Sequence, residues 1–161
     1  MKKLDKKMQK KIKVEHVSIF TIQAPPQFCF SKLSDENIRR RAHKDVLTVQ
    51  MEPEVGGRFV ISCQKPTGTE TVQMKITEYA PPSALKITAP GPDKDLSCTY
   101  RLKRIPSGTR MTVQMQFSID RNWINAIIYL LFRKKLERKW NDYWQRLAVE
   151  IEKEFCQRQL L

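Results

Sequence analysis

Residues 96–119, LSCTYRLKRIPSGTRMTVQMQFSI, contain two runs of alternating polar and apolar side chains on either side of the turn residues PSGT. Alternation with a period of two is typical of a strand with one buried face and one exposed face. A short connection with Pro and Gly between two such runs is typical of an antiparallel hairpin. We therefore predict that the strands before and after PSGT pair with each other.

Five further runs of the same kind precede this hairpin, and each is followed by turn residues rich in Pro or Gly. They are VEHVSIFTIQA, VLTVQME, RFVISCQK, ETVQMKITEY and ALKITA. Two stretches after the first run, PPQFCFSKLSD and ENIRRRAHK, lack the alternation and are expected to form short helices. Short strands at this regular spacing indicate one antiparallel sheet of seven strands.

The apolar residues of these strands fall on one face of the predicted sheet. Such a face must be buried against another element, and the segment from Asp120 onward is the long helical element available. The residues assigned to this face are Leu47, Val49, Met51, Phe59, Ile61, Cys63, Val72, Met74, Ile76, Cys98, Tyr100, Leu102, Met111, Val113, Met115 and Phe117.

These patterns predict an α+β fold, in which a seven-stranded antiparallel sheet wraps around a long C-terminal helix, with two short helices after the first strand. The domain is expected to span residues 14–158. Residues 1–13, MKKLDKKMQKKIK, hold seven Lys and one Asp and form a basic N-terminal arm. The arm is either a solvated tail or, because Leu4, Met8 and Ile12 are spaced by four, a basic amphipathic segment.

The formal charge of +13 raises the question of a nucleic-acid partner. The cations expected on the outer face of the sheet have no aromatic side chain between them on which bases would stack. Nucleic-acid binding is therefore kept only as a second alternative function. These cations are Lys75, Lys86, Arg101 and Lys103.

Other classes of protein and site are excluded by what the sequence lacks. It contains no secretory signal pattern and no run of about 18 apolar residues that would span a bilayer. The four cysteines are far apart and show no CxxC spacing, which favours reduced thiols in a cytoplasmic protein. With two histidines and no clustered ligands, we predict neither a metal site nor a cofactor.

The chain carries four short motifs in sequence: Ala24, Pro25, Cys29, Phe30, Leu33 and Asp35; Val55, Gly56 and Phe59; Pro81, Pro82 and Leu85; and Gly108, Thr109 and Arg110. In this order they resemble the motifs of the START-like superfamily, which includes the polyketide cyclases. The chain departs from the pattern after Asp35, where such families often carry Trp and this chain has NIRRRAHK. The resemblance implies a helix-grip fold with an internal cavity for a hydrophobic ligand.

Together, the face pattern and the resemblance predict binding or transport of a hydrophobic small molecule or lipid between the sheet and the C-terminal helix. The alternative is a cyclase- or dehydrase-like enzyme, for which His16, Glu78 and Tyr100 are the polar candidates inside the cavity. The sequence contains no recognisable catalytic triad, so no catalytic residue is assigned. The predicted ligand-binding residues are Phe20, Ile22, Phe59, Ile61, Met74, Ile76, Glu78, Tyr100, Leu102, Met115, Phe117, Trp140 and Tyr143.

The C-terminal segment carries two apolar stripes, about half a turn apart on a single helix. The distal stripe consists of Leu136, Trp140, Tyr143, Leu147, Ile151 and Phe155, and the proximal stripe of Trp123, Ile124, Ile127, Ile128 and Leu131. Three alternatives follow. A break near Arg133 makes residues 121–132 a lid; a straight helix turns residues 123–132 toward a second subunit; or it turns them toward an anionic membrane. The last alternative would place a cytoplasmic protein at the inner membrane face.

Overall fold

The computed structural model describes residues 11–89, 96–120 and 122–161. Its elements confirm the predicted order: one strand, two short helices, six strands and a long helix. They are β1 (Lys11–Ile22), α1 (Pro26–Lys32), α2 (Glu36–Ala42), β2 (Val46–Met51), β3 (Arg58–Lys65), β4 (Gly68–Ala80), β5 (Ala84–Thr88), β6 (Ser97–Ile105), β7 (Gly108–Asp120) and α3 (Trp123–Gln159).

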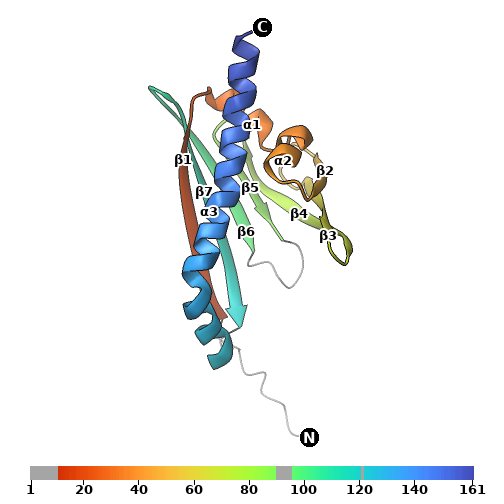
Figure 1. Cartoon of the computed structure of the whole chain (residues 1–161), viewed down its shortest axis with the longest axis vertical. Coiled ribbons are helices and arrows are strands. Elements are labelled where there is room, and N and C mark those ends of the chain that lie inside the picture. The colour runs from red at the N-terminus through yellow and green to blue at the C-terminus, as the bar shows by residue number, and fades with distance from the viewer. Residues whose placement is uncertain (1–10, 90–95, 121) are drawn as a thin grey trace, which may run out of the picture.

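The strands form a seven-stranded antiparallel sheet in the order β1-β7-β6-β5-β4-β3-β2. One face of the sheet curves around α3, which runs along β1 and β7, while α2 lies beside β2 at the other edge (Figure 1). Accordingly α3 packs mainly against β1 and α2, with smaller contacts to α1 and β7. The two helices α2 and α3 thus cover opposite sides of the concave face.

The hairpin around PSGT pairs as predicted. The register joins Ile105 to Gly108 and Tyr100 to Val113 across β6 and β7. Gly108 has a φ of +139°, and a Cβ at this position would lie 2.2 Å from the carbonyl oxygen of Ile22. Only Gly fits this turn, because both its left-handed backbone and its close approach to β1 exclude a side chain.

The apolar face predicted from alternation is the core of the molecule, with two local corrections. Leu47, predicted to face the core, is 37 % exposed, because the β2–β3 register shifts between Val46 and Thr48 and turns Val46 inward instead. In β4 the register with β5 shifts between Ile76 and Glu78. After this shift Tyr79, rather than Glu78, lies on the inner face, where it pairs with the buried Leu85. A bulge changes the side on which each following residue lies.

Val72 differs from prediction for another reason. It pairs with Ile61 in the expected register but is 39 % exposed. The tip of the β3–β4 hairpin lies away from α3 (Figure 1), so the inner face of this part of the sheet is not covered by the helix. The concave face is therefore closed near β1 and more open toward β3 and β4.

The C-terminal segment is one unbroken helix of 37 residues, α3, with a length of about 55 Å. Of the three alternatives, the break near Arg133 that would make a separate lid is therefore wrong. The residues from Arg133 to Lys139 include neither Gly nor Pro, and Arg133 donates from Nε to Glu137 Oε1 at 2.9 Å, a pair that supports the helix. Among the described residues, no helix combines the length and apolar character needed to cross a bilayer.

Candidate functional site

The candidate site lies on the concave face, where a charged side chain is enclosed in the apolar core. Asp35 caps the N-terminus of α2 by accepting from the backbone N–H of Ile38 at 3.1 Å. With α2 beginning at this cap, Ile38, Arg39 and Ala42 lie on the side of the helix that faces the core, and all three are buried. Arg39 is 2 % exposed, so its guanidinium group lies inside the molecule.

The hydrogen bonds of Arg39 go to neutral oxygen atoms. Its Nε donates to the carbonyl oxygen of Leu33 at 2.7 Å, and its Nη2 donates to the hydroxyl of Tyr100 at 3.1 Å. No carboxylate within the described parts of the chain forms a salt bridge with Arg39. Because an arginine stays protonated, the core holds a positive charge without a negative partner.

Aromatic rings surround this charge. The guanidinium carbon lies 5.9 Å from each of the ring centroids of Phe59, Tyr100 and Trp144. The faces of aromatic rings attract cations, which offsets part of the lost hydration of Arg39. Burial raises the pKa of Tyr100 well above its ordinary value, so its hydroxyl is a neutral phenol beside the guanidinium.

His43 completes the polar cluster from the end of α2. Its ring stacks on Tyr143 with centroids 3.6 Å apart and planes 3° apart. Burial, and secondarily the charge of Arg39, lowers the pKa of His43 to about 4, so the imidazole is neutral at pH 7. Its Nε2 and the Nε1 of Trp144 are buried and have no hydrogen-bond partner in the described structure. Buried polar atoms are normally paired, so the cluster offers unused hydrogen-bonding groups.

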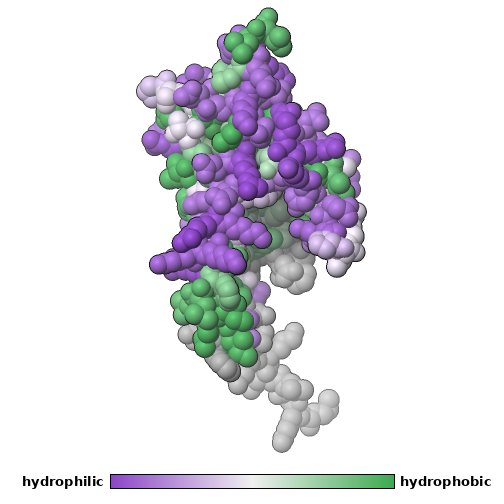
Figure 2. All heavy atoms as spheres, in the orientation of Figure 1, coloured by the Kyte–Doolittle hydropathy of each residue, from purple (hydrophilic) through white to green (hydrophobic). Residues whose placement is uncertain are grey.

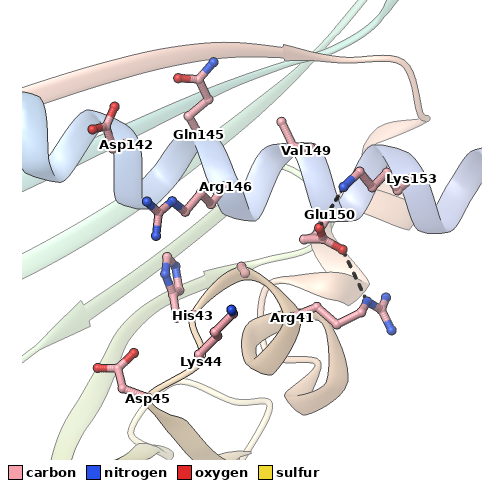
Figure 3. Close-up of a pocket in the computed structure, with 11 residues that line it drawn as sticks. Arg41, His43, Lys44, Asp45, Asp142, Gln145, Arg146, Val149, Glu150 and Lys153 are labelled. Carbon is pink, nitrogen blue, oxygen red and sulfur yellow. Dashed lines mark hydrogen bonds and ion pairs between the residues drawn. The ribbon is translucent and has the colours of Figure 1, made fainter. Parts of the chain in front are cut away.

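A cleft of about 850 Å³ lies between α2 and α3, next to this cluster. Its wall carries charges of both signs, and Glu150 accepts from Arg41 at 3.3 Å and from Lys153 at 3.2 Å (Figure 3). His43 lines the same cleft and points toward α3 in Figure 3. The same His43 ring stacks on Tyr143 and is close enough to Arg39 for the guanidinium charge to lower its pKa, so His43 contacts both the cleft and the buried cluster.

The apolar residues predicted to bind ligand line the same concave face as this cluster. Six of them are buried, namely Ile22, Phe59, Met74, Ile76, Tyr100 and Leu102. The others are half-buried, namely Phe20, Ile61, Met115, Phe117, Trp140 and Tyr143.

Glu78 does not belong to this face. Beyond the bulge in β4 it points outward, where its carboxylate accepts from both Nη atoms of Arg101 at 2.8 and 3.0 Å. It therefore cannot act as an acid or base inside the cavity.

His16, the third polar candidate, is buried on the inner face of β1, beside α3. Its Nε2 lies 2.9 Å from the Ser18 hydroxyl, and that hydroxyl donates to the Asn141 side chain. The His16 ring also contacts Trp140, with centroids 5.4 Å apart. These contacts form a polar chain between β1 and α3.

Sequence reasoning missed Arg39 and His43. The run Arg39–Arg41 is typical of a solvated basic face on the second short helix, and Arg40 and Arg41 are indeed exposed. The spacing of Ile38 and Ala42 marks the buried side of this helix, but at about 100° per residue Arg39 and Arg41 lie equally far from its centre, so the sequence carried no signal that singles out Arg39. His43 directly follows this helix, and its backbone N–H donates to the carbonyl oxygen of Arg39, which fixes its position at the helix end.

Comparison with known proteins agrees with this architecture. Residues 11–152 match the family described as polyketide cyclase/dehydrase and lipid transport. A protein of unknown function from Staphylococcus aureus has a TM-score of 0.68 and 13 % identity over 90 % of this chain and 97 % of its own. A Nitrosomonas europaea protein has a TM-score of 0.67 and 14 % identity over 88 % of this chain and 96 % of its own.

A further similar structure has a stated biosynthetic role. It is the di-domain aromatase/cyclase StfQ from the steffimycin biosynthetic pathway, with a TM-score of 0.64 and 12 % identity over 88 % of this chain and 51 % of its own. At such identities the likeness concerns the fold. No curated protein matches the sequence.

Proposed function

This chain belongs to the polyketide cyclase/dehydrase and lipid transport family, and from this membership together with its buried cation we propose the following function. The protein binds a hydrophobic small molecule or lipid between the sheet and α3. An anionic or strongly polarised oxygen of that ligand is held at Arg39. The family and fold support hydrophobic ligand binding or cyclase-like chemistry as the general role.

The buried Arg39 is the observation that carries this proposal. A guanidinium removed from water loses several kcal/mol of hydration, which neutral partners recover only in part. An anionic oxygen at this place would receive charge-assisted hydrogen bonds in a medium of low dielectric constant. Carboxylates, phenolates and enolates have the required chemistry.

The apolar part of the ligand would lie against the half-buried side chains of the concave face. Ile61 and Met115 are partly exposed although they face the core. Figure 2 shows the surface hollowed beside α3, on the side of β3 and β4, with hydrophobic atoms visible in the hollow. Such a concave, mostly apolar surface with a few convergent polar groups is typical of small-molecule sites.

A cyclase-like enzyme is the second candidate, and the pair formed by Arg39 and Tyr100 favours it. A cation and a neutral phenol near one ligand oxygen would stabilise an enolate formed from a ketone. Among the residues proposed from sequence, His16 and Tyr100 remain inside as acid–base candidates, whereas Glu78 is outside. The carrier is preferred because Glu78, the carboxylate proposed as acid or base, lies outside the site, and no described carboxylate forms an ion pair with Arg39.

The location of the protein is part of the same proposal. All four cysteines are free thiols, and Cys29 and Cys98 are buried. Burial raises the pKa of Cys98 to about 11, which keeps it a thiol rather than a reactive thiolate. Reduced cysteines of this kind support a cytoplasmic carrier.

Binding of a fluorescent fatty acid, compared with its methyl ester, tests this function. The wild-type protein is expected to bind the acid more tightly than the ester. Arg39→Met should weaken binding of the acid by about ten- to a hundredfold, the equivalent of one charge-assisted hydrogen bond. Binding of the ester should change little.

Arg40→Met is the matched control, because Arg40 is the next residue and its side chain is 54 % exposed. Tyr100→Phe keeps the ring and removes only the hydroxyl to which Arg39 donates. Circular dichroism verifies that each variant is folded. Equal affinity of the wild-type protein for acid and ester, unchanged in Arg39→Met, would contradict the role of Arg39. Absence of any bound apolar probe, together with native mass spectra showing no co-purified ligand, would contradict the carrier itself.

A further inference from the structure

The first three turns of α3 expose a continuous set of large apolar side chains, which we term the apolar tip. Their exposed fractions lie between 47 % and 73 %. They form the hydrophobic patch at the lower end of the molecule in Figure 2. Patches of this kind on a folded domain mark sites of interaction. The apolar tip consists of Ile124, Ile127, Ile128, Leu130, Leu131 and Phe132.

The direction of the apolar tip follows from the continuity of α3. Trp144, Leu147 and Ile151 are buried against the sheet and fix the inward side of the helix. At about 100° per residue, Ile124 and Ile128 lie on roughly the opposite side. A straight helix cannot bring both stripes to the core, so the apolar tip faces away from the sheet.

A cluster of four cations, the basic collar, follows the apolar tip on the same side of α3. It consists of Lys134, Lys135, Arg138 and Lys139, all exposed. Glu137, the acidic residue of this stretch, lies on the other side of the helix and pairs with Arg133 at 2.9 Å. Within the described ranges none of the four collar cations forms an ion pair, and Figure 2 shows strongly hydrophilic side chains directly above the apolar tip.

The basic N-terminal arm joins the fold at this same end. Lys11, the first described residue, pairs with Asp120, three residues before α3 begins. Residues 1–13 contain seven Lys and one Asp. The apolar tip is thus followed by positive charge along α3, and β1 begins at the end of the sheet where α3 starts.

We propose that the apolar tip docks on the surface of a membrane containing anionic lipid. The apolar side chains enter the boundary between headgroups and acyl chains, and the basic collar contacts the phosphates. Interfacial helices combine these two features, and each Lys or Arg near an anionic surface adds to the attraction. A second copy of the chain fits less well, because two tips in contact would bring two basic collars together.

Vesicle flotation of the full chain tests this proposal. The protein should float with phosphatidylcholine vesicles that contain phosphatidylglycerol, which is anionic. It should not float with vesicles of phosphatidylcholine alone. Raising the salt from about 0.1 M to about 1 M shortens the Debye length from about 10 Å to about 3 Å and should release most of it. The variant Ile124→Asp with Ile128→Asp should reduce the bound fraction at least about tenfold.

Val149→Asp is the matched control, because Val149 is 43 % exposed on the same helix but outside the apolar tip. Lys134→Gln with Lys135→Gln should lower binding to anionic vesicles without changing the oligomeric state. Equal flotation of the wild-type protein and the Ile124/Ile128 variant overturns the proposal. So does a wild-type dimer that the same variant converts to monomer without any effect on vesicles, since the apolar tip would then be a subunit interface.

Discussion

Arg39 on α2 and His43, which directly follows α2, form a polar cluster inside an apolar core. The guanidinium is enclosed by rings and bonded to the Tyr100 hydroxyl at 3.1 Å, and the imidazole lies against Tyr143. Burial, and secondarily the positive charge of Arg39, lowers the pKa of His43. The cluster therefore keeps His43 neutral and contains one fixed cation.

The pH dependence of stability should reveal His43. Burial and then Arg39 lower its folded-state pKa from 6.5 to about 4. The unfolded chain therefore takes up a proton first, and stability is lost as the pH falls from about 6.5 toward 4, by on the order of 2 to 3 kcal/mol. Urea unfolding at pH 7, 5.5 and 4 should show this loss in the wild-type protein and a smaller one in His43→Gln.

Proton NMR provides the direct measurement. The chain has two histidines, so His16→Gln leaves one imidazole signal, which belongs to His43. Its titration midpoint should lie near pH 4. A midpoint at the ordinary histidine value would show that the ring is not enclosed beside Arg39.

At the scale of elements, the β3–β4 and β6–β7 hairpin turns differ in what surrounds their glycines, Gly68 and Gly108. Gly68, between β3 and β4, has a φ of +130°, and a Cβ at this position would have no atom within 4 Å, whereas a Cβ at Gly108 would lie 2.2 Å from the Ile22 carbonyl oxygen. The first turn projects from the sheet, and the second lies against the end of β1. Only the second couples a turn to the packing of another strand.

Alanine at each position separates these effects. Gly68→Ala should cost about 1 kcal/mol, the penalty for a side chain in a left-handed conformation. Gly108→Ala should cost clearly more, about 3 kcal/mol or above, because β1 must also move. Urea unfolding of both variants at pH 7 measures the difference, and equal costs would mean that β1 yields without strain.

On the scale of the whole molecule, α3 performs two separate tasks along its length. Its C-terminal half closes the concave face with Trp144, Leu147 and Ile151, each at most 6 % exposed. Its N-terminal third contributes little to that core and presents the apolar tip instead. Global stability therefore depends on the second half of the helix.

A pair of leucines tests this division. Leu147→Ala leaves a cavity in the core, where the side chain is 0 % exposed, and should cost about 3 to 5 kcal/mol. Leu131→Ala changes a side chain that is 73 % exposed and should alter the free energy of unfolding by at most about 0.5 kcal/mol. A large cost at Leu131 in a dilute monomer would show that the N-terminal third also packs against the fold.

The alternation of apolar residues by itself determined the seven strands, their antiparallel pairing and the inward face of most of them, because each strand repeats a period of two over several residues. The hairpin at PSGT and the closure of the sheet by Leu147 and Ile151 follow from such repeated local patterns. Tertiary structure alone decided where Leu47 and Glu78 lie, since each bulge depends on the register with a neighbouring strand. It also decided the burial of Arg39, because a charged side chain enters a core only where surrounding rings and carbonyl groups, distant in sequence, compensate its lost hydration.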